Sequence, residues 1–368
     1  MSSRIKLDII LIVLFFLVSC SYNPQSKKEN SSFLPRATGE NNEMLIVMDS
    51  SKFKGSIGRA LVETYGEFLR GLPQPETRFD LIYIKPRKFN NILKHAKNIV
   101  IAFTLEGKSL DSEILRKNFN SESLDKIKSD STLFYFSRRD QYAKGQTVLY
   151  LFSKSDDDLL KKIKKNKSAI LKYFEDELKK RVDRKIFSKL EKNISDKLFD
   201  DHQIKIKIPY GYDLAKNIKG ENKNFFWLRQ LDSEFEKNIF LYYEEYEESE
   251  LKNFYDVFNA DEPNIKRIRN KISKSFLKDS ENSKIFMSIQ DVFPITSKKI
   301  SFKGNSSIES VGLWKLSDIS AGGPFKSIII YNSNKKRVYY LEGYVYAPGS
   351  KKRNLMQEIS SILMTFEI

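Results

Sequence analysis

Histidine and cysteine, two residue types that often carry catalysis or bind metals, are sparse in this chain of 368 residues. His95 and His202 are its two histidines, and neither has a partner at the spacing of a metal-ligand pair. No Gly-x-Ser-x-Gly segment marks a nucleophilic serine, and no Asp/Asn loop with a central glycine marks a calcium site. We therefore expect no catalytic residues of these classes, no metal ion and no cofactor.

Carboxylates are abundant, with 48 Asp and Glu residues. Glycosidases work through a pair of carboxyl groups, so a pair near the end of a predicted strand, Glu106 and Asp111, is the first candidate. An acidic run comprises Glu244, Glu245, Glu247, Glu248 and Glu250. Such a run could hold a cation, but it more often forms a solvated face. Neither set carries a further catalytic signal.

A glycine-containing turn, Gly55-Ser56-Ile57-Gly58, follows the first predicted strand and opens a helix. Backbone N–H groups at a helix N-terminus can bind an anion. The turn lacks both the Gly-x-Gly-x-x-Gly spacing and the Lys-Ser/Thr pair of a P-loop. We interpret it as a loop that leads into a helix, with Ser56 as the hydrogen-bond partner of the free backbone N–H groups at the helix N-terminus.

The C-terminal region holds three distinctive segments, Gly312-Leu313-Trp314, Ala321-Gly322-Gly323-Pro324-Phe325 and Leu341-Glu342-Gly343-Tyr344-Val345-Tyr346-Ala347-Pro348. One interpretation is a ligand cleft formed by Trp314, Gly322, Gly323, Pro324, Glu342, Tyr344 and Tyr346. The other is sheet packing with a tight corner at the two glycines. Burying Glu342 unpaired would be costly. It should therefore face solvent or accept a charge-assisted bond, with Arg337 or Lys352 as the expected donor.

Cys20 is the single cysteine and follows an apolar run at residues 9–18, which Arg4 and Lys6 precede. This pattern is typical of a secretory signal peptide, and the run is too short for a membrane-spanning helix. Leu17-Val18-Ser19-Cys20 resembles a bacterial lipobox. That resemblance implies a signal peptide at residues 1–19 and a lipid on Cys20 that anchors the chain to a membrane. The polar residues 20–42 then form the lipidated N-terminus and a flexible tether.

The formal net charge is +16, which raises nucleic acid and anionic membranes as partners. Lysine outnumbers arginine, whereas proteins that read nucleic acid favour arginine for bidentate contacts. The chain has no arginine cluster and no nucleic-acid-binding module. We therefore expect no nucleic-acid partner, while contact with anionic lipid headgroups or lipopolysaccharide phosphates fits an anchored protein.

The elements divide the folded part into three regions. At residues 43–155, strands predicted at 44–48, 79–84, 99–105, 132–136 and 147–152 alternate with helical segments at 57–69 and 89–95, an α/β layer. Residues 156–200 form a long helical segment, because residues 146–208 contain neither Gly nor Pro. Its apolar positions recur every fourth residue from Ile170 to Leu198. A spacing of four residues differs from the period of about 3.5 residues that a coiled coil requires, so we expect this helical face to pack on the neighbouring sheet instead.

Residues 201–368 are rich in consecutive strands, predicted at 204–208, 225–228, 239–243, 285–289, 307–316, 325–331 and 338–346. Helices are predicted at 250–277 and 355–366. Consecutive strands with flanking helices indicate an antiparallel sheet with helices on one face. The expected fold class of the whole chain is α+β.

Two further distinctive segments are Leu34-Pro35-Arg36-Ala37-Thr38-Gly39 and Gly71-Leu72-Pro73-Gln74-Pro75-Glu76. Together with the C-terminal segments, they resemble the DUF4837 lipoproteins of Bacteroidetes, a family of unknown function. Residues 201–368 are also similar to the PsbP/Mog1-type α/β/α sandwich. The resemblance implies an envelope lipoprotein and transfers no catalytic residue.

These inferences lead to one expected function and one alternative. We expect a non-catalytic binding or assembly module of the cell envelope, on the outer membrane and facing the periplasm. Its partner would be an envelope protein or glycan. The alternative is an envelope hydrolase that acts on peptidoglycan or polysaccharide through paired carboxylates.

Overall fold

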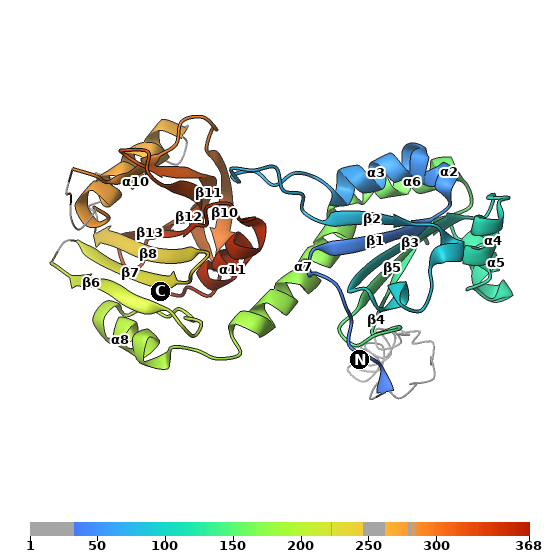
Figure 1. Ribbon diagram of the computed structural model, residues 1–368, viewed down its shortest axis with the longest axis horizontal. Helices are drawn as coiled ribbons and strands as arrows, with labels where there is room; N and C mark the ends of the chain where they lie inside the picture. Colours follow the sequence, from blue (N-terminus) through green and yellow to red (C-terminus); the bar gives the residue numbers. More distant parts are fainter. Residues whose placement is uncertain (1–32, 222, 246–261, 279–281, 283) are drawn as a thin grey trace, which may run out of the picture.

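The computed structural model describes residues 33–221, 223–245, 262–278, 282 and 284–368. The predicted signal peptide, Cys20 and part of the tether lie outside these residues, as do Glu247, Glu248, Glu250 and the first part of the helix predicted at 250–277. Two domains, each built on its own sheet, lie at opposite ends of the molecule, and helix α7 (Lys167–Ile186) runs from one toward the other (Figure 1).

The first sheet has the strand order β2-β1-β3-β5-β4. Its strands are β1 (Glu43–Met48), β2 (Asp80–Ile84), β3 (Asn98–Thr104), β4 (Tyr135–Arg139) and β5 (Thr147–Ser153). Four strands run parallel, and β4 pairs antiparallel with β5. β3 and β5 are buried along their whole length, which is typical of parallel strands covered on both faces.

Helices cover both faces of this first sheet. Met44, Ile46 and Met48 of β1 pack with α3 (Ser56–Tyr65), α6 (Asp156–Lys165) and α7, whereas Leu45 and Val47 pack with α4 (Leu110–Arg116) and α5 (Ser121–Ser129). The short helix α2 (Ser50–Lys54) and the 3-10 turns η2 (Pro86–Lys88) and η3 (Leu93–His95) complete the domain. The predicted α/β layer is confirmed.

The predicted helical stripe belongs to two helices and two cores. Ile170, Phe174, Leu178 and Val182 of α7 pack in the core of the first sheet, which confirms the preference for sheet packing over a coiled coil. Helix α8 (Lys192–His202) follows after a short connection, and its Leu198 packs in the core of the second domain. Ile186, at the end of α7, contacts both cores.

The second sheet is antiparallel throughout, with the order β10-β11-β12-β13-β8-β7-β6 and β9 beside β11. Its strands are β6 (Asp213–Lys219), β7 (Asn224–Leu231), β8 (Glu236–Glu245), β9 (Met287–Ile289), β10 (Thr296–Phe302), β11 (Asn305–Leu316), β12 (Gly322–Asn332) and β13 (Arg337–Tyr346). The predicted α+β class and the antiparallel C-terminal sheet are confirmed.

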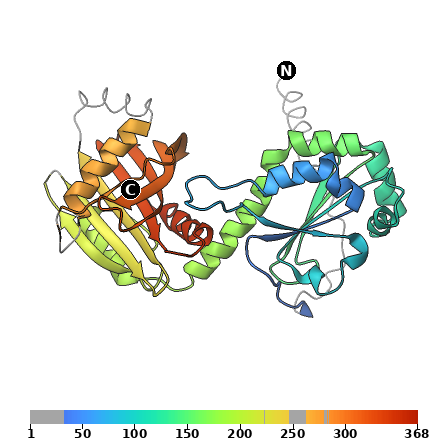
Figure 2. The same ribbon diagram turned by 45° about the horizontal axis from the view of Figure 1, so that its top comes forward.

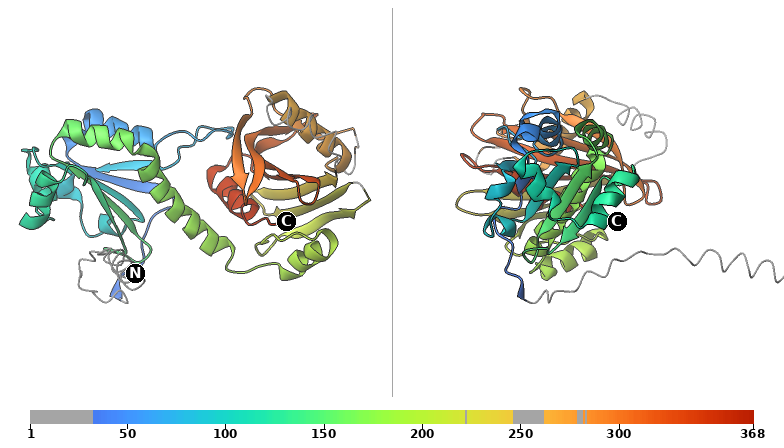
Figure 3. Two further views of the ribbon diagram at one scale, coloured as in Figure 1. Left: turned by 180° about the vertical axis from the view of Figure 1, so that it is seen from behind. Right: turned by 90° about the vertical axis from the view of Figure 1, so that its right-hand side faces the viewer.

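Helices were expected on one face of this sheet, but they cover both. Ile239 and Leu241 of β8 pack with α8 and α11 (Arg353–Leu363), and Phe240 and Tyr242 pack against α10 (Glu262–Phe276) on the opposite face. The reason lies in the strands, because β8 is apolar at consecutive positions and both of its faces need cover. Figure 3 shows this layering from behind.

The segment at 204–208 differs from its predicted strand. Ile204, Ile206 and Ile208 are buried in the core, as their alternation requires. The segment pairs through isolated bridges, Lys205 with Glu367 and Leu190 with Pro209, rather than through a ladder. The edge strands β6 and β10 were not predicted, because most of their side chains are polar and lie outside the core.

Candidate functional site

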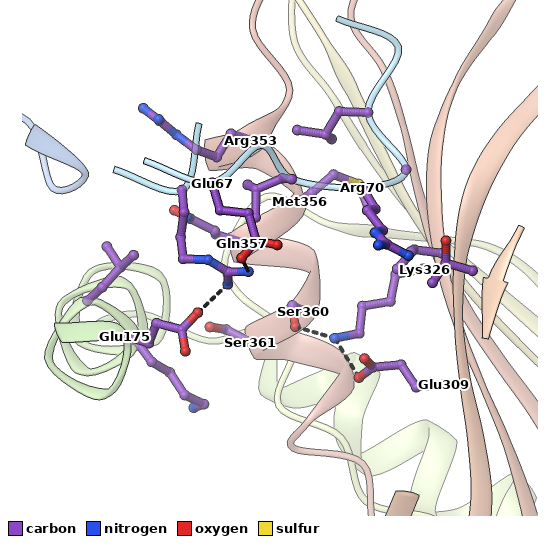
Figure 4. Close-up of a pocket in the computed structure, with 18 of the residues that line it drawn as sticks. Glu67, Arg70, Glu175, Glu309, Lys326, Arg353, Met356, Gln357, Ser360 and Ser361 are labelled. Atoms are coloured by element: carbon purple, nitrogen blue, oxygen red, sulfur yellow. Dashed lines mark hydrogen bonds and ion pairs between the residues drawn. The ribbon is translucent and has the colours of Figure 1, made fainter. Parts of the chain in front are cut away.

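A cavity of about 540 Å³ lies where the two domains meet. Its walls come from the loop at residues 66–79, which we call the docking loop, and from α7, α11 and strands β10 to β12 (Figure 4). The volume falls within the range of about 300–1,000 Å³ that is common for small-molecule sites. Because both domains contribute to its walls, the cavity belongs to neither domain alone.

The docking loop is a narrow hairpin that reaches from the first domain onto the second (Figure 2). The Leu69 N–H donates to the Glu76 carbonyl at 2.9 Å, which holds the two arms together. At its tip Gly71 has φ +76, and a Cβ there would lie 3.0 Å from the Cβ of Val311 and 3.2 Å from the Gly312 nitrogen. Glycine thus allows both the left-handed turn and the close approach to β11.

Glu76, 5% exposed, ties the docking loop to the N-terminus of α11. Its carboxylate accepts from the backbone N–H groups of Lys352, at 2.7 Å, and Arg353, at 3.1 Å. The Arg353 guanidinium donates in turn to the Thr77 carbonyl and to both carboxylate oxygens of Asp80. These bonds from Arg353 hold the pKa of Asp80 below its usual value. The loop and the helix are therefore locked by charge-assisted hydrogen bonds.

A second contact joins α7 to α11. Glu358 of α11 pairs with Lys237 of β8 at 2.6 Å and with Lys185 of α7 at 3.2 Å. Burial by itself would raise the pKa of Glu358, but the two lysines outweigh it and lower the pKa. The carboxylate stays ionised at neutral pH and bridges the domains.

Ion pairs neutralise most of the charged side chains in the cavity wall. Glu309 pairs with Lys298 at 2.9 Å and with Lys326 at 2.8 Å, and Lys326 also donates to the Ser360 hydroxyl at 3.0 Å. Burial would raise the pKa of Glu309, but the lysines outweigh it and lower the pKa. Arg78 and Glu175, which also line the cavity, form another ion pair.

Arg70, at the tip of the docking loop, is the exception. It is exposed, and it forms no hydrogen bond or ion pair with any described residue. In Figure 4 Arg70 and Lys326 lie on the same side of the cavity, and Lys326 already shares Glu309 with Lys298. Three cations therefore face one carboxylate on this side of the cavity. The nearby side chains of Gln357 and Ser361, which also line it, are likewise unpaired within the described part of the chain.

The residues of the sequence-predicted cleft are brought together, but in a packed core. Trp314, Tyr344 and Glu342 are at most 4% exposed. The Trp314 indole N–H donates to the Val345 carbonyl at 3.2 Å, and a Cβ on Gly323 would lie only 2.1 Å from that same oxygen. Gly322 and Pro324 lie in β12, and Tyr346 packs against the same core. None of the seven residues lines the interdomain cavity.

Glu342 accepts the expected charge-assisted bond, but the expected donors were wrong. Its carboxylate is held by Arg269 of α10, with Nη2 to Oε1 at 2.7 Å and Nε to Oε2 at 2.8 Å. The Tyr340 hydroxyl donates to the same carboxylate at 2.7 Å. Arg337 instead pairs with Glu245, and Lys352 lies at the start of α11. Arg269 and Glu342 are both fully buried.

The carboxylates first suggested for catalysis have structural partners. Asp111 pairs with Arg87 at 3.2 Å, and Glu106 accepts from the backbone N–H of Asp156 at 2.6 Å. Glu244, which belongs to the acidic run considered as a cation site, accepts from the Tyr242 hydroxyl at 2.5 Å. These contacts separate Glu106 and Asp111 into different bonding networks.

The histidines and the glycine turn also have structural surroundings. His202 is buried between the Tyr243 hydroxyl and the Asn217 side chain, and burial lowers its pKa. His95 lies in the turn η3. A Cβ on Gly58 would overlap the Phe53 carbonyl, so this glycine serves close packing of α2 against α3. Among the described residues, no three His, Cys, Asp or Glu side chains gather as a metal site.

The carboxyl ends of parallel strands are the usual place for a ligand in α/β sheets. Here α4 fills that place. Asp49, which follows β1, accepts from the Ser51 N–H at 2.7 Å and from the hydroxyls of Ser109 and Ser112. Burial would raise the pKa of Asp49, but these bonds outweigh it and lower the pKa to about 2. Lys52 pairs with Asp156 beside them. The polar groups of this edge are therefore used internally.

Comparison with known families gives two matches. Residues 191–365 match a family model described as "Domain of unknown function (DUF4837)", and residues 37–187 match one described as "Domain of unknown function (DUF8532)". The two regions meet between α7 and α8. The predicted DUF4837 resemblance is confirmed for the second domain. No curated protein matches the chain.

Among solved structures, a mutant of the protein Mog1 and the Ran-binding protein Mog1p of Saccharomyces cerevisiae are similar to this chain at a TM-score of 0.26 and 10% identity. Each match covers 45% of this chain and 90% or 89% of the other. That similarity is too low to support a functional argument. In the part of the chain that the structure describes, no helix has the length and hydrophobicity needed to span a membrane.

Proposed function

Because residues 191–365 match a family model of unknown function, we propose a role from the chain's own geometry. The protein is a non-catalytic binding module of the bacterial cell envelope, and the interdomain cavity holds a saccharide component of that envelope. A lipid on Cys20 anchors it to the outer membrane, with its domains in the periplasm. The lipobox-like segment before Cys20 supports the anchor.

The cavity is the observation that carries this proposal. The Glu76 and Glu358 contacts hold the two domains together, so the cavity persists without a ligand. Thr296, Gln357 and Ser361 offer hydroxyl and amide groups to sugar hydroxyls, and Leu72, Val311 and Met356 offer apolar surface to the ring. A concave site with apolar walls and a few polar groups suits a small ligand better than a protein surface.

The cavity carboxylates favour binding over hydrolysis. A glycosidase needs a carboxylic acid whose pKa is raised, so that it can protonate the leaving group. The pKa of Glu309 is lowered instead, by Lys326 and Lys298. Glu175 is occupied by Arg78. No specific observation therefore favours the envelope hydrolase as a second candidate.

The test uses the full-length lipidated protein in nanodiscs. Titration with soluble muropeptides and with core oligosaccharides of lipopolysaccharide should give saturable binding to at least one of them. Mass spectrometry after prolonged incubation should recover the bound saccharide unchanged. Cleavage of either probe would support the hydrolase, and a lack of binding to both would overturn the proposal.

The anchor has its own test in cells. Replacing Cys20 with alanine should abolish incorporation of a tagged fatty acid, because the thiol is the group that carries the lipid, and should leave an unprocessed precursor. Equal labelling of Cys20→Ala and the unmodified sequence would contradict the anchor.

A further inference from the structure

We infer that the interdomain cavity selects an anionic saccharide, whose phosphate or carboxylate lies between Arg70 and Lys326. This inference rests on the proposed function and adds the chemical class of its ligand. It follows from the unequal distribution of charge around the cavity.

Arg70 is a cation held in place by backbone rather than by an ion pair. Its neighbour Gly71 is fixed against Val311 of β11, and the loop arms are joined through Leu69 and Glu76. The guanidinium has no partner among the described residues. An arginine whose backbone is held in place and whose guanidinium N–H groups are unpaired can bind a carboxylate or a phosphate in bidentate geometry.

The two lysines that line the cavity together with Arg70 are only partly neutralised by carboxylates. Lys298 and Lys326 share the single carboxylate of Glu309. Arg70 lines the same cavity, so this side carries an excess of positive charge. A bound anion would supply the missing negative charge, through charge-assisted bonds to the guanidinium and the ammonium groups.

Neutral donors surround the same position. The Ser360 hydroxyl accepts from Lys326, which leaves its own proton free to be donated to a ligand oxygen. Gln357 and Ser361 lie on the same helix as Ser360 and line the cavity. A saccharide whose anionic group lies at Arg70 could therefore donate and accept hydrogen bonds with these side chains of α11, which Figure 4 labels.

The experiment compares three probes that differ in one group: glucose 6-phosphate, glucuronic acid and glucose. Full-length protein in nanodiscs should bind at least one anionic probe about tenfold or more tightly than glucose, since hydrogen bonds to charged groups have that magnitude. Arg70→Gln should reduce the affinity for that probe to the level of glucose. Arg59→Gln, which makes the same charge change on α3 outside the cavity, should leave it unchanged.

Each outcome decides the inference. Preference for the phosphate points to a phosphorylated saccharide and preference for the carboxylate to a uronic or muramic acid; both support it if Arg70→Gln removes the preference. Equal binding of all three probes, unaffected by Arg70→Gln, overturns the inference and leaves the proposed function intact. Binding of none of the probes, nor of the larger envelope saccharides, overturns both.

Discussion

Glu342 and Arg269 form an ion pair with no exposed surface between β13 and α10. Arg269 also donates to the Ser288 carbonyl at 3.2 Å and lies over the Phe325 ring at 4.7 Å from its centroid. Each charge is stable there because the other compensates it. The pair therefore joins α10 to the sheet and explains why an acid can occupy a strand interior.

Glu342→Gln should destabilise the second domain by about 3 kcal/mol, because it leaves Arg269 buried without an opposing charge. The free energy of unfolding, measured by urea denaturation of the full chain, checks this value. The double variant Arg269→Met with Glu342→Leu should regain much of the loss, since no buried charge remains. A Glu342→Gln protein as stable as the unmodified one would contradict the role of the pair.

At the residue scale, the sequence predicted that Glu342 needs a charged partner, but it did not identify Arg269 as that partner. The place of Glu342 in an apolar strand predicted a charged partner. The donor comes from a helix whose rotation about its axis depends on packing against the sheet, so Arg269 gave no local signal. Arg70 gave none either, because it lies in a loop without periodicity.

The docking loop and α11 are the elements that shape the candidate site. Lys352 and Arg353 start a helix with no side-chain cap of its own, and Glu76 of the other domain supplies the missing acceptor. N-terminal N–H groups of a helix need such a partner when they are buried. The contact thus completes an element of one domain with a side chain of the other.

Glu76→Ala should expose these N–H groups and weaken the contact by about 1–2 kcal/mol, the usual effect of losing a helix cap. Hydrogen–deuterium exchange should show faster amide exchange in the first turn of α11. Glu63→Ala, an exposed glutamate of α3, is the matched control and should show no change. Identical protection of α11 in both variants would be the contrary result.

The elements themselves were predicted where burial dominates their sequence. β1, β3, β5 and β8 are near-continuous apolar runs, and their positions follow from that pattern. β10 at the sheet edge has a polar sequence and was missed. The alternation of apolar and polar residues at 204–208 correctly predicted which side chains are buried. It did not predict the strand pairing, because an extended segment can be buried without joining a β-ladder.

At the scale of the whole molecule, the site arises from two domains that each use their own polar groups internally. The predicted cleft lies in the core of one domain, and the carboxyl edge of the first sheet is filled by α4. The cavity forms only because the docking loop contacts β11 and α11. Sequence analysis within single domains could not reveal it. Yet Gly71 and Gly312, which lie in two segments that stand out in the sequence, meet there.

The most direct test of the account is the affinity of the full-length protein for its preferred anionic probe, glucose 6-phosphate or glucuronic acid, before and after the cavity is filled. Gln357 is half-buried in the cavity wall, so Gln357→Trp places an indole within the cavity. Isothermal titration should show binding to the unmodified protein and none to Gln357→Trp, while circular dichroism and thermal unfolding stay the same. Equal affinity of the two proteins would contradict a ligand site between the domains.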